Sequence, residues 1–374
     1  MDVNNRVLGL IFASLHDSSV MELTKVRTMG SILFGGRYRL IDFPLSNMVN
    51  SGVSEVGVIT KSNYGSLMDH LGSGREWDLA RKRGGLHLLP PFSHEGGGIY
   101  RGRLEALNNV WSYVGNAQAD YIILSDCDII TTIDFRKVIK AHEESGADIT
   151  AVYAKDKADP EDPHYGDIFE FDENGKITEV LINPEISGEV NRSLDMFVLS
   201  KDFLKKIVKD AAARGKYSFE KDVLQAEKDK YKFYGYRHDG YFSKIDSMSS
   251  YFKANLDLLN FENRQKLFNP DFPIYTKVRD NAPVKYGLES DVKNSEIADG
   301  CIIEGTVENS ILFRGVKVEK GAVVKNCVLQ QGTSIGKGCS IEAVITDKNV
   351  EISEDKVLTG SKDYPVYIAK NAKI

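Results

Sequence analysis

Acidic side chains of the kind that hold a metal ion beside a nucleotide follow an apolar stretch in the first half of the chain. Asp126 and Asp128 come directly after the run Tyr121–Ser125, and Asp246 lies much later in the sequence. Carboxylate oxygens suit the hard cation Mg²⁺, so these acids could bind a magnesium ion. The competing interpretation is structural, because an Asp after a strand often stabilises the turn that follows.

A second stretch that could do chemistry follows the apolar run Val7–Ala13, which is typical of a buried parallel strand. The loop after such a strand is where α/β proteins usually hold phosphates, and it needs glycines for close backbone approach. Here the loop, Ser14–Ser19, reads SLHDSS. Asp17 would place a negative charge where a triphosphate should lie, so we interpret this segment as a disabled phosphate loop.

The rest of the first 260 residues alternates strand-like and helix-like segments. Such alternation predicts an α/β domain with a mixed, mostly parallel sheet that has helices on both faces. The Asn-Gly pair at 174–175 predicts a hairpin turn. We expect strands at Val7–Ala13, Val56–Thr60, Tyr121–Ser125, Ile149–Tyr153, Ile168–Phe171, Met196–Leu199 and Phe233–Tyr236. We expect helices at Asn63–Leu71, Leu104–Val114, Phe135–Ser145, Phe203–Arg214 and Ser249–Leu259.

A six-residue repeat follows near the end of the chain. The segments 297–303, 318–324 and 335–341 each carry two β-branched residues six apart, with Gly at the fourth position. This period predicts a parallel β-helix, whereas an antiparallel sheet rich in Val and Ile is the alternative. Before the repeat, residues 260–285 lose periodicity and contain prolines. We therefore predict domains at 1–259 and 286–374, joined by a linker at 260–285.

Composition excludes several classes of protein. With a net charge of −6, the chain has no basic footprint for nucleic acid. No apolar stretch approaches the roughly 20 residues of a membrane helix, and the polar segment Met1–Asn5 is unlike a signal peptide. The four cysteines form no C-x-x-C pair. We expect reduced thiols and a cytoplasmic protein without nucleic-acid or membrane partners.

The segment Phe34–Asn47, FGGRYRLIDFPLSN, closely resembles the FGGKYRIIDFPLSN signature of ADP-glucose pyrophosphorylases. Leu23-Thr-Lys25 and the run Tyr251–Leu259 belong to the same resemblance. It implies a Rossmann-like, GT-A-like nucleotidyltransferase domain followed by a left-handed parallel β-helix of hexapeptide repeats. It also implies the family's reaction, in which ATP and glucose-1-phosphate give ADP-glucose and pyrophosphate for glycogen or starch synthesis.

Positions that carry function in active family members are changed in this chain. Cys127 and Lys244 stand at the two metal-binding Asp positions; a thiol is a poor ligand for Mg²⁺, and a lysine would compete with the cation. Asn183 replaces the Lys that contacts the sugar phosphate, and Phe92 replaces a Gln that contacts adenine. The degenerate phosphate-binding positions are Ser14, Leu15 and Asp17 for glycines, Ser19 for Arg and Met29 for Lys. Together these losses resemble the regulatory, GlgD-type branch of the family.

The FGGRYR segment, by contrast, keeps its basic residues. Arg37 stands where relatives carry a Lys that binds anionic activators, and an arginine fork suits phosphate. Arg37 and Arg39 are therefore candidates for binding an anionic sugar-phosphate effector. The alternative is that both pair with acids such as Asp42. The basic stretch Gly72–Arg83, which includes a Trp, is either an effector or partner surface or a solvated loop.

These observations predict a regulatory subunit with little or no catalysis, with no catalytic residue, metal or cofactor of its own. We expect it to assemble with a catalytic homologue, as a heterotetramer, and to form homo-oligomers alone. The alternative is an active sugar-1-phosphate nucleotidyltransferase that uses magnesium, ATP and the carboxylates of Asp126, Asp128 and Asp246. A hexapeptide acyltransferase is a weaker alternative, because all seven histidines precede the repeat.

Overall fold

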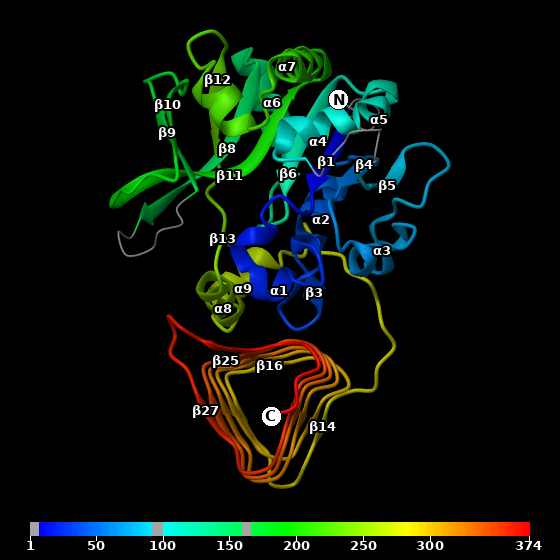
Figure 1. Cartoon of the computed structure of the whole chain (residues 1–374), viewed down its shortest axis with the longest axis vertical. Coiled ribbons are helices and arrows are strands. Elements are labelled where there is room, and N and C mark those ends of the chain that lie inside the picture. The colour runs from blue at the N-terminus through cyan, green and yellow to red at the C-terminus, as the bar shows by residue number, and fades with distance from the viewer. Residues whose placement is uncertain (1–6, 92–99, 159–165) are drawn as a thin grey trace.

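An α/β unit and a β-helix make up the protein, in the order predicted (Figure 1). The computed structural model describes residues 7–91, 100–158 and 166–374. The α/β unit ends with α9 (Phe261–Leu267), which lies inside the segment predicted as a linker. Residues 268–284 then lead to the first strand of the β-helix, β14 (Lys285–Tyr286), with little regular structure.

The strand β1 (Val7–Phe12) lies at the centre of the α/β sheet, and all six of its residues are buried. It pairs in parallel with β4 (Glu55–Ile59) on one side and β6 (Tyr121–Asp126) on the other. β5 (Gly85–Leu89), which the sequence did not predict, extends this half of the sheet in parallel. Because parallel strands end at the same edge, the residues that follow β1 and β6 are brought together.

Antiparallel strands form the other half of the sheet. Their bounds are β8 (Ile149–Ala158), β9 (Asp167–Phe171), β10 (Ile177–Ile182) and β11 (Gly188–Ser200), with β12 (Phe233–Arg237) parallel to β8. Within the described ranges the strand order is β10-β9-β11-β6-β1-β4-β5; off this path, β8 pairs with β11, and β12 pairs with β8. β9 and β10 form the predicted hairpin at Asn174-Gly175. The register of β11 against β8 shifts between Ser193 and Phe197, which marks a bulge.

Helices cover both faces of this sheet (Figure 1). Their bounds are α1 (Met21–Thr24), α2 (Asp42–Asn50), α3 (Gly65–Leu71), α4 (Arg103–Asn109), α5 (Trp111–Asn116), α6 (Phe135–Ser145), α7 (Lys201–Arg214) and α8 (Met248–Asp257). α6 has the predicted bounds, because Asp134 caps its start and Gly146 ends it with φ 60°. The predicted helix Leu104–Val114 is instead divided into α4 and α5. Among the described residues, no helix has the length and apolar character needed to cross a membrane.

The C-terminal repeat forms a β-helix that is triangular when viewed along its axis (Figure 1). Within residues 285–368, all described, parallel strands stack into three five-stranded sheets. Ile303, Val318, Ile335 and Ile352 occupy equivalent positions in successive coils and point inward. This stacking confirms the β-helix over the antiparallel alternative. The strands after β14 are β15 (Asp291–Lys293), β16 (Glu296–Ile297), β17 (Ile302–Ile303), β18 (Thr306–Glu308), β19 (Ile311–Leu312), β20 (Lys317–Val318), β21 (Val323–Lys325), β22 (Val328–Leu329), β23 (Ser334–Ile335), β24 (Ser340–Glu342), β25 (Val344–Thr346), β26 (Glu351–Ile352), β27 (Val357–Thr359) and β28 (Val366–Ile368).

One apolar core crosses the boundary between the two units, which we call the joint. Phe313 and Val328 of the β-helix belong to the same buried cluster as Phe34 and Tyr251 of the α/β unit. Two side chains also form a buried ion pair across the joint: Arg27 donates to both carboxylate oxygens of Asp347, at 2.8 and 2.9 Å. The Tyr251 hydroxyl donates to the carbonyl of Leu33 at 2.8 Å and accepts from Gln330 at 3.2 Å. The two units are therefore joined by a buried apolar interface with polar contacts across it.

Candidate functional site

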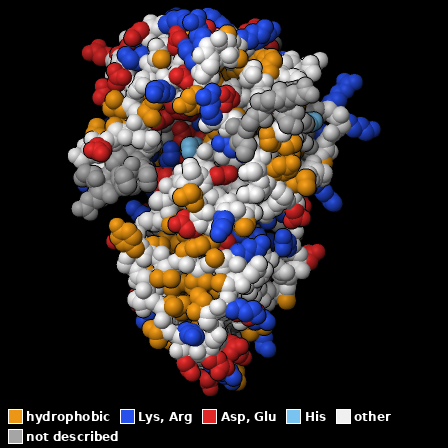
Figure 2. Space-filling model, viewed as in Figure 1, with side chains coloured by type: hydrophobic (Ala, Val, Ile, Leu, Met, Phe, Trp, Pro, Cys, Tyr) orange, Lys and Arg blue, Asp and Glu red, His pale blue; other side chains and the backbone are white. Residues whose placement is uncertain are grey.

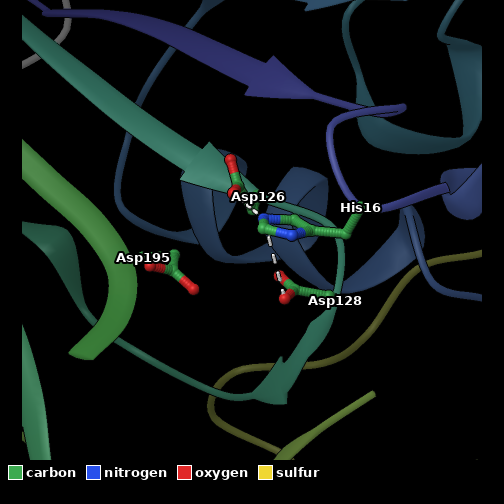
Figure 3. Close-up of side chains that lie close together, drawn as sticks. All are labelled: His16, Asp126, Asp128 and Asp195. Carbon is green, nitrogen blue, oxygen red and sulfur yellow. Dashed lines mark hydrogen bonds and ion pairs between the residues drawn. The ribbon is translucent and has the colours of Figure 1, made fainter. Parts of the chain in front are cut away.

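Four side chains, which we call the carboxylate cluster, meet at the carboxyl edge of the sheet (Figure 3). His16 comes from the loop after β1, Asp126 ends β6, Asp128 follows β6, and Asp195 comes from β11. One possible ligand atom from each lies within 4.8 Å of the others. The three carboxylates are almost fully buried, whereas 33% of the His16 side chain is exposed. Figure 2 shows a hollow on this face of the α/β unit where acidic, basic and histidine side chains gather.

The chain at the end of β6 determines which residues enter the cluster. Asp126 ends β6 and Asp128 lies in the bend that follows; both enter the cluster, whereas the side chain of Cys127 between them does not. Cys127 is buried in the apolar core, where a Cβ on Gly30 would lie 3.3 Å from its sulfur. Burial raises the pKa of its thiol well above the ordinary value. The position aligned with a metal-binding Asp is thus a core residue, and its two neighbours supply the carboxylates.

Asp126 is held by two cationic side chains. His16 Nε2 lies 2.7 Å from Asp126 Oδ2, and Arg103 at the start of α4 donates to the same oxygen at 3.0 Å. Arg103 also lies 3.0 Å from a carboxylate oxygen of Glu220. Its guanidinium is 3% exposed overall and stacks near the rings of Phe12, Phe197 and Phe219. The guanidinium charge is therefore already matched inside the protein.

Asp195 is held by Lys244, the residue that stands at the second metal-binding Asp position. Lys244 ends β13 (Phe242–Lys244), which pairs antiparallel with β7 (Ile129–Thr131). Its Nζ donates to Asp195 Oδ2 at 2.7 Å and lies 3.8 Å from Asp128 Oδ2. The charge inversion seen in the sequence therefore places an ammonium beside the carboxylate cluster.

Burial and ion pairing shift the pKa values of these groups in opposite directions. Burial opposes the charged form of His16, but the carboxylates of Asp128 and Asp126 outweigh it and raise the pKa of His16 to about 10. Burial likewise acts to raise the pKa of Asp195, but Lys244, His16 and Arg103 together outweigh it and lower that pKa to about 2. Asp128 has no such close partner, so burial raises its pKa to about 6. Burial also raises the pKa of neighbouring Asp167 to about 7.

The carboxylate cluster has the residue types and spacing to hold a metal ion. Both carboxylate oxygens of Asp128 and one of Asp126 are buried and accept no hydrogen bond from any residue that the structure describes. Oxygen atoms of this kind suit Mg²⁺. We expected no metal site, and the structure instead brings together His16, Asp126, Asp128 and Asp195 as residues that could hold one. The Lys244 ammonium lies beside two of them.

The disabled phosphate loop packs against neighbouring parts of the α/β unit, with hydrogen bonds to Met29 and Lys61. Asp17 accepts a hydrogen bond from the backbone nitrogen of Met29 at 2.7 Å, and burial raises its pKa to about 6. Ser14 Oγ accepts from the backbone nitrogen of Lys61 at 3.2 Å, and Leu15 packs against an apolar cluster. Ser19 lies in the 3-10 helix Asp17–Val20. A carboxylate, not an anion-binding backbone, therefore occupies the centre of this loop.

Three other predicted positions lie elsewhere or outside the described residues. Asp246 is absent from the carboxylate cluster: it precedes α8, where its backbone nitrogen donates to Ser250 Oγ at 2.9 Å. The metal set proposed from the sequence is thus corrected, with Asp195 and His16 in place of Asp246. Asn183 is exposed with φ 46°, and its backbone nitrogen donates to the carbonyl of Gly166 at 3.1 Å. Phe92 falls outside the described residues.

Arg37 and Arg39 lie at the joint and not at the carboxylate cluster. Both line a cavity that also contains Lys277, Arg279 and Arg314. Lys277 and Arg314 have carboxylate partners, at 3.6 and 3.1 Å. Within the described ranges, Arg37, Arg39 and Arg279 form no ion pair. Three of the five lysine and arginine side chains that line the joint cavity therefore have no carboxylate within ion-pair distance among the described residues.

The sequence left open that Arg39 pairs with Asp42. In the structure the two residues are joined by the backbone nitrogen of Arg39, not by its guanidinium. Asp42 accepts from the Arg39 backbone nitrogen at 2.9 Å and pairs with His70 at 2.6 Å. The Arg39 guanidinium donates instead to the carbonyl and hydroxyl of Ser66, at 2.7 and 2.9 Å. Trp77 of the basic stretch is 1% exposed, so it belongs to the core and not to a recognition surface.

Sequence reasoning missed His16, Arg103 and Asp195 as members of the site. His16 could have been found, because it follows β1 directly and the loop of the first strand faces the end of β6. Asp195 carried no local signal: it lies within a long strand, and only the pairing of Met196 with Ser125 places it beside Asp126.

Comparison with protein families agrees with this architecture. The family described as "Nucleotidyl transferase" matches residues 10–261, and "GlmU-like, C-terminal hexapeptide" matches residues 282–363. The fold and these matches thus place the chain in the nucleotidyl transferase class, with a C-terminal hexapeptide β-helix.

Similar curated proteins narrow this class. The chain is 37% identical to "Glycogen biosynthesis protein GlgD" of Bacillus subtilis (strain 168) over 98% of its own length and 96% of that protein. It is 38% identical to the GlgD protein of Geobacillus stearothermophilus, over 86% of this chain and 84% of that one. A "Glucose-1-phosphate adenylyltransferase" of Clostridium botulinum (strain Eklund 17B / Type B) is 34% identical, with coverages of 86% and 84%. The chain belongs to the ADP-glucose pyrophosphorylase family, as the FGGRYR segment predicted.

Proposed function

We propose that this chain serves glycogen biosynthesis as a regulatory subunit of ADP-glucose pyrophosphorylase that does not itself catalyse the reaction. The observation that carries the proposal is the pairing of two cations beside the carboxylate cluster with protein carboxylates: Arg103 with Asp126, and Lys244 with Asp195. Similarity to two GlgD glycogen-biosynthesis proteins supports the pathway.

Catalysis by this family depends on charge that the cleft lacks. Transfer from ATP is achieved mainly by positioning the phosphates among cations that stabilise the developing negative charge. Here Asp17 lies in the phosphate loop, and Asp126 and Asp128 lie opposite it. A triphosphate would meet these carboxylates, while the charges of Arg103 and Lys244 are already paired with Asp126 and Asp195. Loss of several such interactions together lowers the rate by many orders of magnitude.

A partner subunit is the second part of the proposal. Hydrophobic side chains gather on the end of the β-helix that faces the viewer in Figure 2. The exposed apolar residues of the last coil are Val357, Tyr364 and Ile374, which are 72%, 84% and 37% exposed. Open strand edges and apolar ends of a β-helix usually need covering. We propose that a catalytic homologue covers such surfaces in a heterotetramer and that the chain alone forms homo-oligomers.

Regulation is proposed to act through the joint cavity. Arg37, Arg39 and Arg279 all line this cavity and form no ion pair with a carboxylate among the described residues. An anionic sugar phosphate matches this chemistry, because arginine forks bind phosphate oxygens in pairs. The cavity lies between the α/β unit and the β-helix, so a bound anion would contact both.

The test is to assay ADP-glucose formation by the purified chain alone, by a catalytic homologue alone, and by the two together. We expect no turnover by the chain alone and a changed activity or effector response in the mixture. Sedimentation of the mixture should show a complex absent from either sample alone. A monomer that ignores the homologue would contradict the regulatory assignment.

One observation favours a second function, an active nucleotidyltransferase with a rearranged metal site. The Asp128 carboxylate accepts no hydrogen bond from the described residues and is free to bind Mg²⁺ with ATP. In that case the pure chain should make ADP-glucose, and both Asp126→Asn and Asp128→Asn should abolish it. Absence of product with magnesium and ATP present removes this alternative.

A further inference from the structure

Lys244 is fixed beside the carboxylate cluster by the backbone on either side of it. β13 pairs Lys244 with Ile129, the residue that follows Asp128. The next backbone nitrogen, that of Ile245, donates to the Asp128 carbonyl at 2.8 Å. These contacts hold the lysine and Asp128 in fixed register, so their proximity does not depend on a flexible loop.

The Lys244 side chain is also enclosed. It is 9% exposed, and a Cβ on Gly166 would lie 2.7 Å from its Nζ. Gly166 has φ +69°, a conformation that glycine adopts readily, and the absent side chain leaves space for the ammonium. The lysine is therefore built into the cleft and does not reach it from the surface.

Asp195, the partner of Lys244, adopts a backbone conformation that suits glycine better. Its φ is +52°, at the bulge where the register of β11 shifts. Left-handed backbone at a residue other than glycine costs free energy, although Asp tolerates it better than most. The 2.7 Å contact with Lys244 Nζ gives this strained residue a compensating interaction.

The carboxylate of Asp128, by contrast, has no hydrogen-bond partner in the cluster. Asp128 is 1% exposed, and neither of its oxygens accepts a hydrogen bond from the described residues, while Lys244 Nζ lies 3.8 Å away. A divalent cation bound to Asp128 and Asp195 at about 2.1 Å would lie close to this ammonium, and the two positive charges would repel strongly in a buried site.

We propose that the Lys244 ammonium is a built-in cation that replaces a divalent metal ion at the carboxylate cluster, so that His16, Asp126, Asp128 and Asp195 form a latent metal site that opens only when this charge is removed. The protein then needs no metal for folding, and the carboxylate cluster does not bind the complex of a metal ion with a nucleotide. This inference does not rest on the regulatory function, because it concerns only the cluster and its ions.

The experiment measures Mn²⁺ binding by titration followed with electron paramagnetic resonance, and melting temperature with EDTA or millimolar Mn²⁺. The parent should bind Mn²⁺ weakly and melt at one temperature in both solutions. Lys244→Ala leaves buried carboxylates unpaired, so it should melt lower in EDTA and recover in Mn²⁺. Its affinity for Mn²⁺ should exceed the parent's by about 5–150-fold, the usual range for coupling between two sites.

Two controls make the result specific. Lys253→Ala removes an exposed lysine from α8 and should behave as the parent. Lys244→Ala combined with Asp195→Asn removes a proposed ligand, so the Mn²⁺ response should disappear. Tight Mn²⁺ binding by the parent would overturn the proposal whether or not the variants fold. Equal Mn²⁺ affinity in the parent and a folded Lys244→Ala would overturn it as well, without affecting the assay for ADP-glucose.

Discussion

The carboxylate cluster and the joint cavity are both rich in charged side chains, but they differ in whether the cations form ion pairs. In the cluster, Arg103 and Lys244 are buried and paired with carboxylates. In the joint cavity, Arg37 and Arg39 have no carboxylate partner among the described residues. Paired buried charge holds a structure together, whereas unpaired charge attracts a ligand. The difference supports the proposal that ligand recognition in this chain has its centre at the joint and not at the carboxylate cluster.

The largest expected effect comes from breaking a pair in the cluster. Arg103→Met keeps apolar packing against the neighbouring aromatic rings but leaves Asp126 and Glu220 without their shared partner. Removing one member of a buried ion pair typically costs about 3–5 kcal/mol of unfolding free energy. Urea unfolding measures this loss. Arg101→Met is the matched control, because its pair with Glu105 lies at the surface and should contribute little. Equal loss in both variants would contradict the comparison.

The second effect concerns the joint. Arg37→Ala should leave folding and assembly intact and shift the activation curve of the mixed enzyme by about 5–150-fold, the usual range of allosteric coupling. Lys317→Ala, an exposed lysine on the β-helix, serves as control and should leave the curve unchanged. An activation curve of Arg37→Ala that overlays the parent's would make Arg37 a structural residue.

A smaller effect, dependent on pH, should come from Lys348 at the joint. Burial, together with Arg39 and Arg27, lowers its pKa to about 7 from the ordinary 10.5. The unfolded chain therefore binds a proton that the folded chain does not, so stability falls as the pH falls from about 10 to 7 and then levels off. Lys348→Gln should remove this dependence and gain about 1–2 kcal/mol at pH 7, given partial exposure. Denaturant unfolding at pH 7 and pH 9 measures it, and parallel pH profiles would count against it.

The smallest effect sharpens the account of the β-helix, whose corners contain Asn309 and Asn326 with φ near 47° and 49°. Ala343 occupies the corresponding corner one coil later, with φ 50°. The hydrogen bonds show the equivalence: the backbone nitrogen of Ala343 donates to the carbonyl of Lys325, as that of Asn326 donates to the carbonyl of Glu308. Ala343→Gly should relieve this conformation and stabilise the protein by roughly 0.5 kcal/mol, although it loses a buried methyl group. Ala322→Gly, at another buried β-helix position, should destabilise it.

Much of the fold could be predicted from sequence, but only part of the site. Strong local patterns identified β1, α6 and the β-helix, because apolar runs, capping residues and six-residue periods can each be recognised from residues close together in the sequence. The carboxylates Asp126 and Asp128 were found in the same way. Asp195 and Lys244 meet because β11 pairs with β6 and β13 with β7. Such contacts depend on strand register between distant segments, which local patterns do not contain.

The joint described above also bears on how the protein folds and how it could be divided. A single buried cluster contains Phe34 and Tyr251 together with Phe313 and Val328, and the Arg27–Asp347 pair is sealed within the same interface. Separation would expose a wide apolar face and an unpaired charge on each fragment. We therefore expect the α/β unit and the β-helix to unfold together, and an exchange of either unit would require the surface between them to be rebuilt.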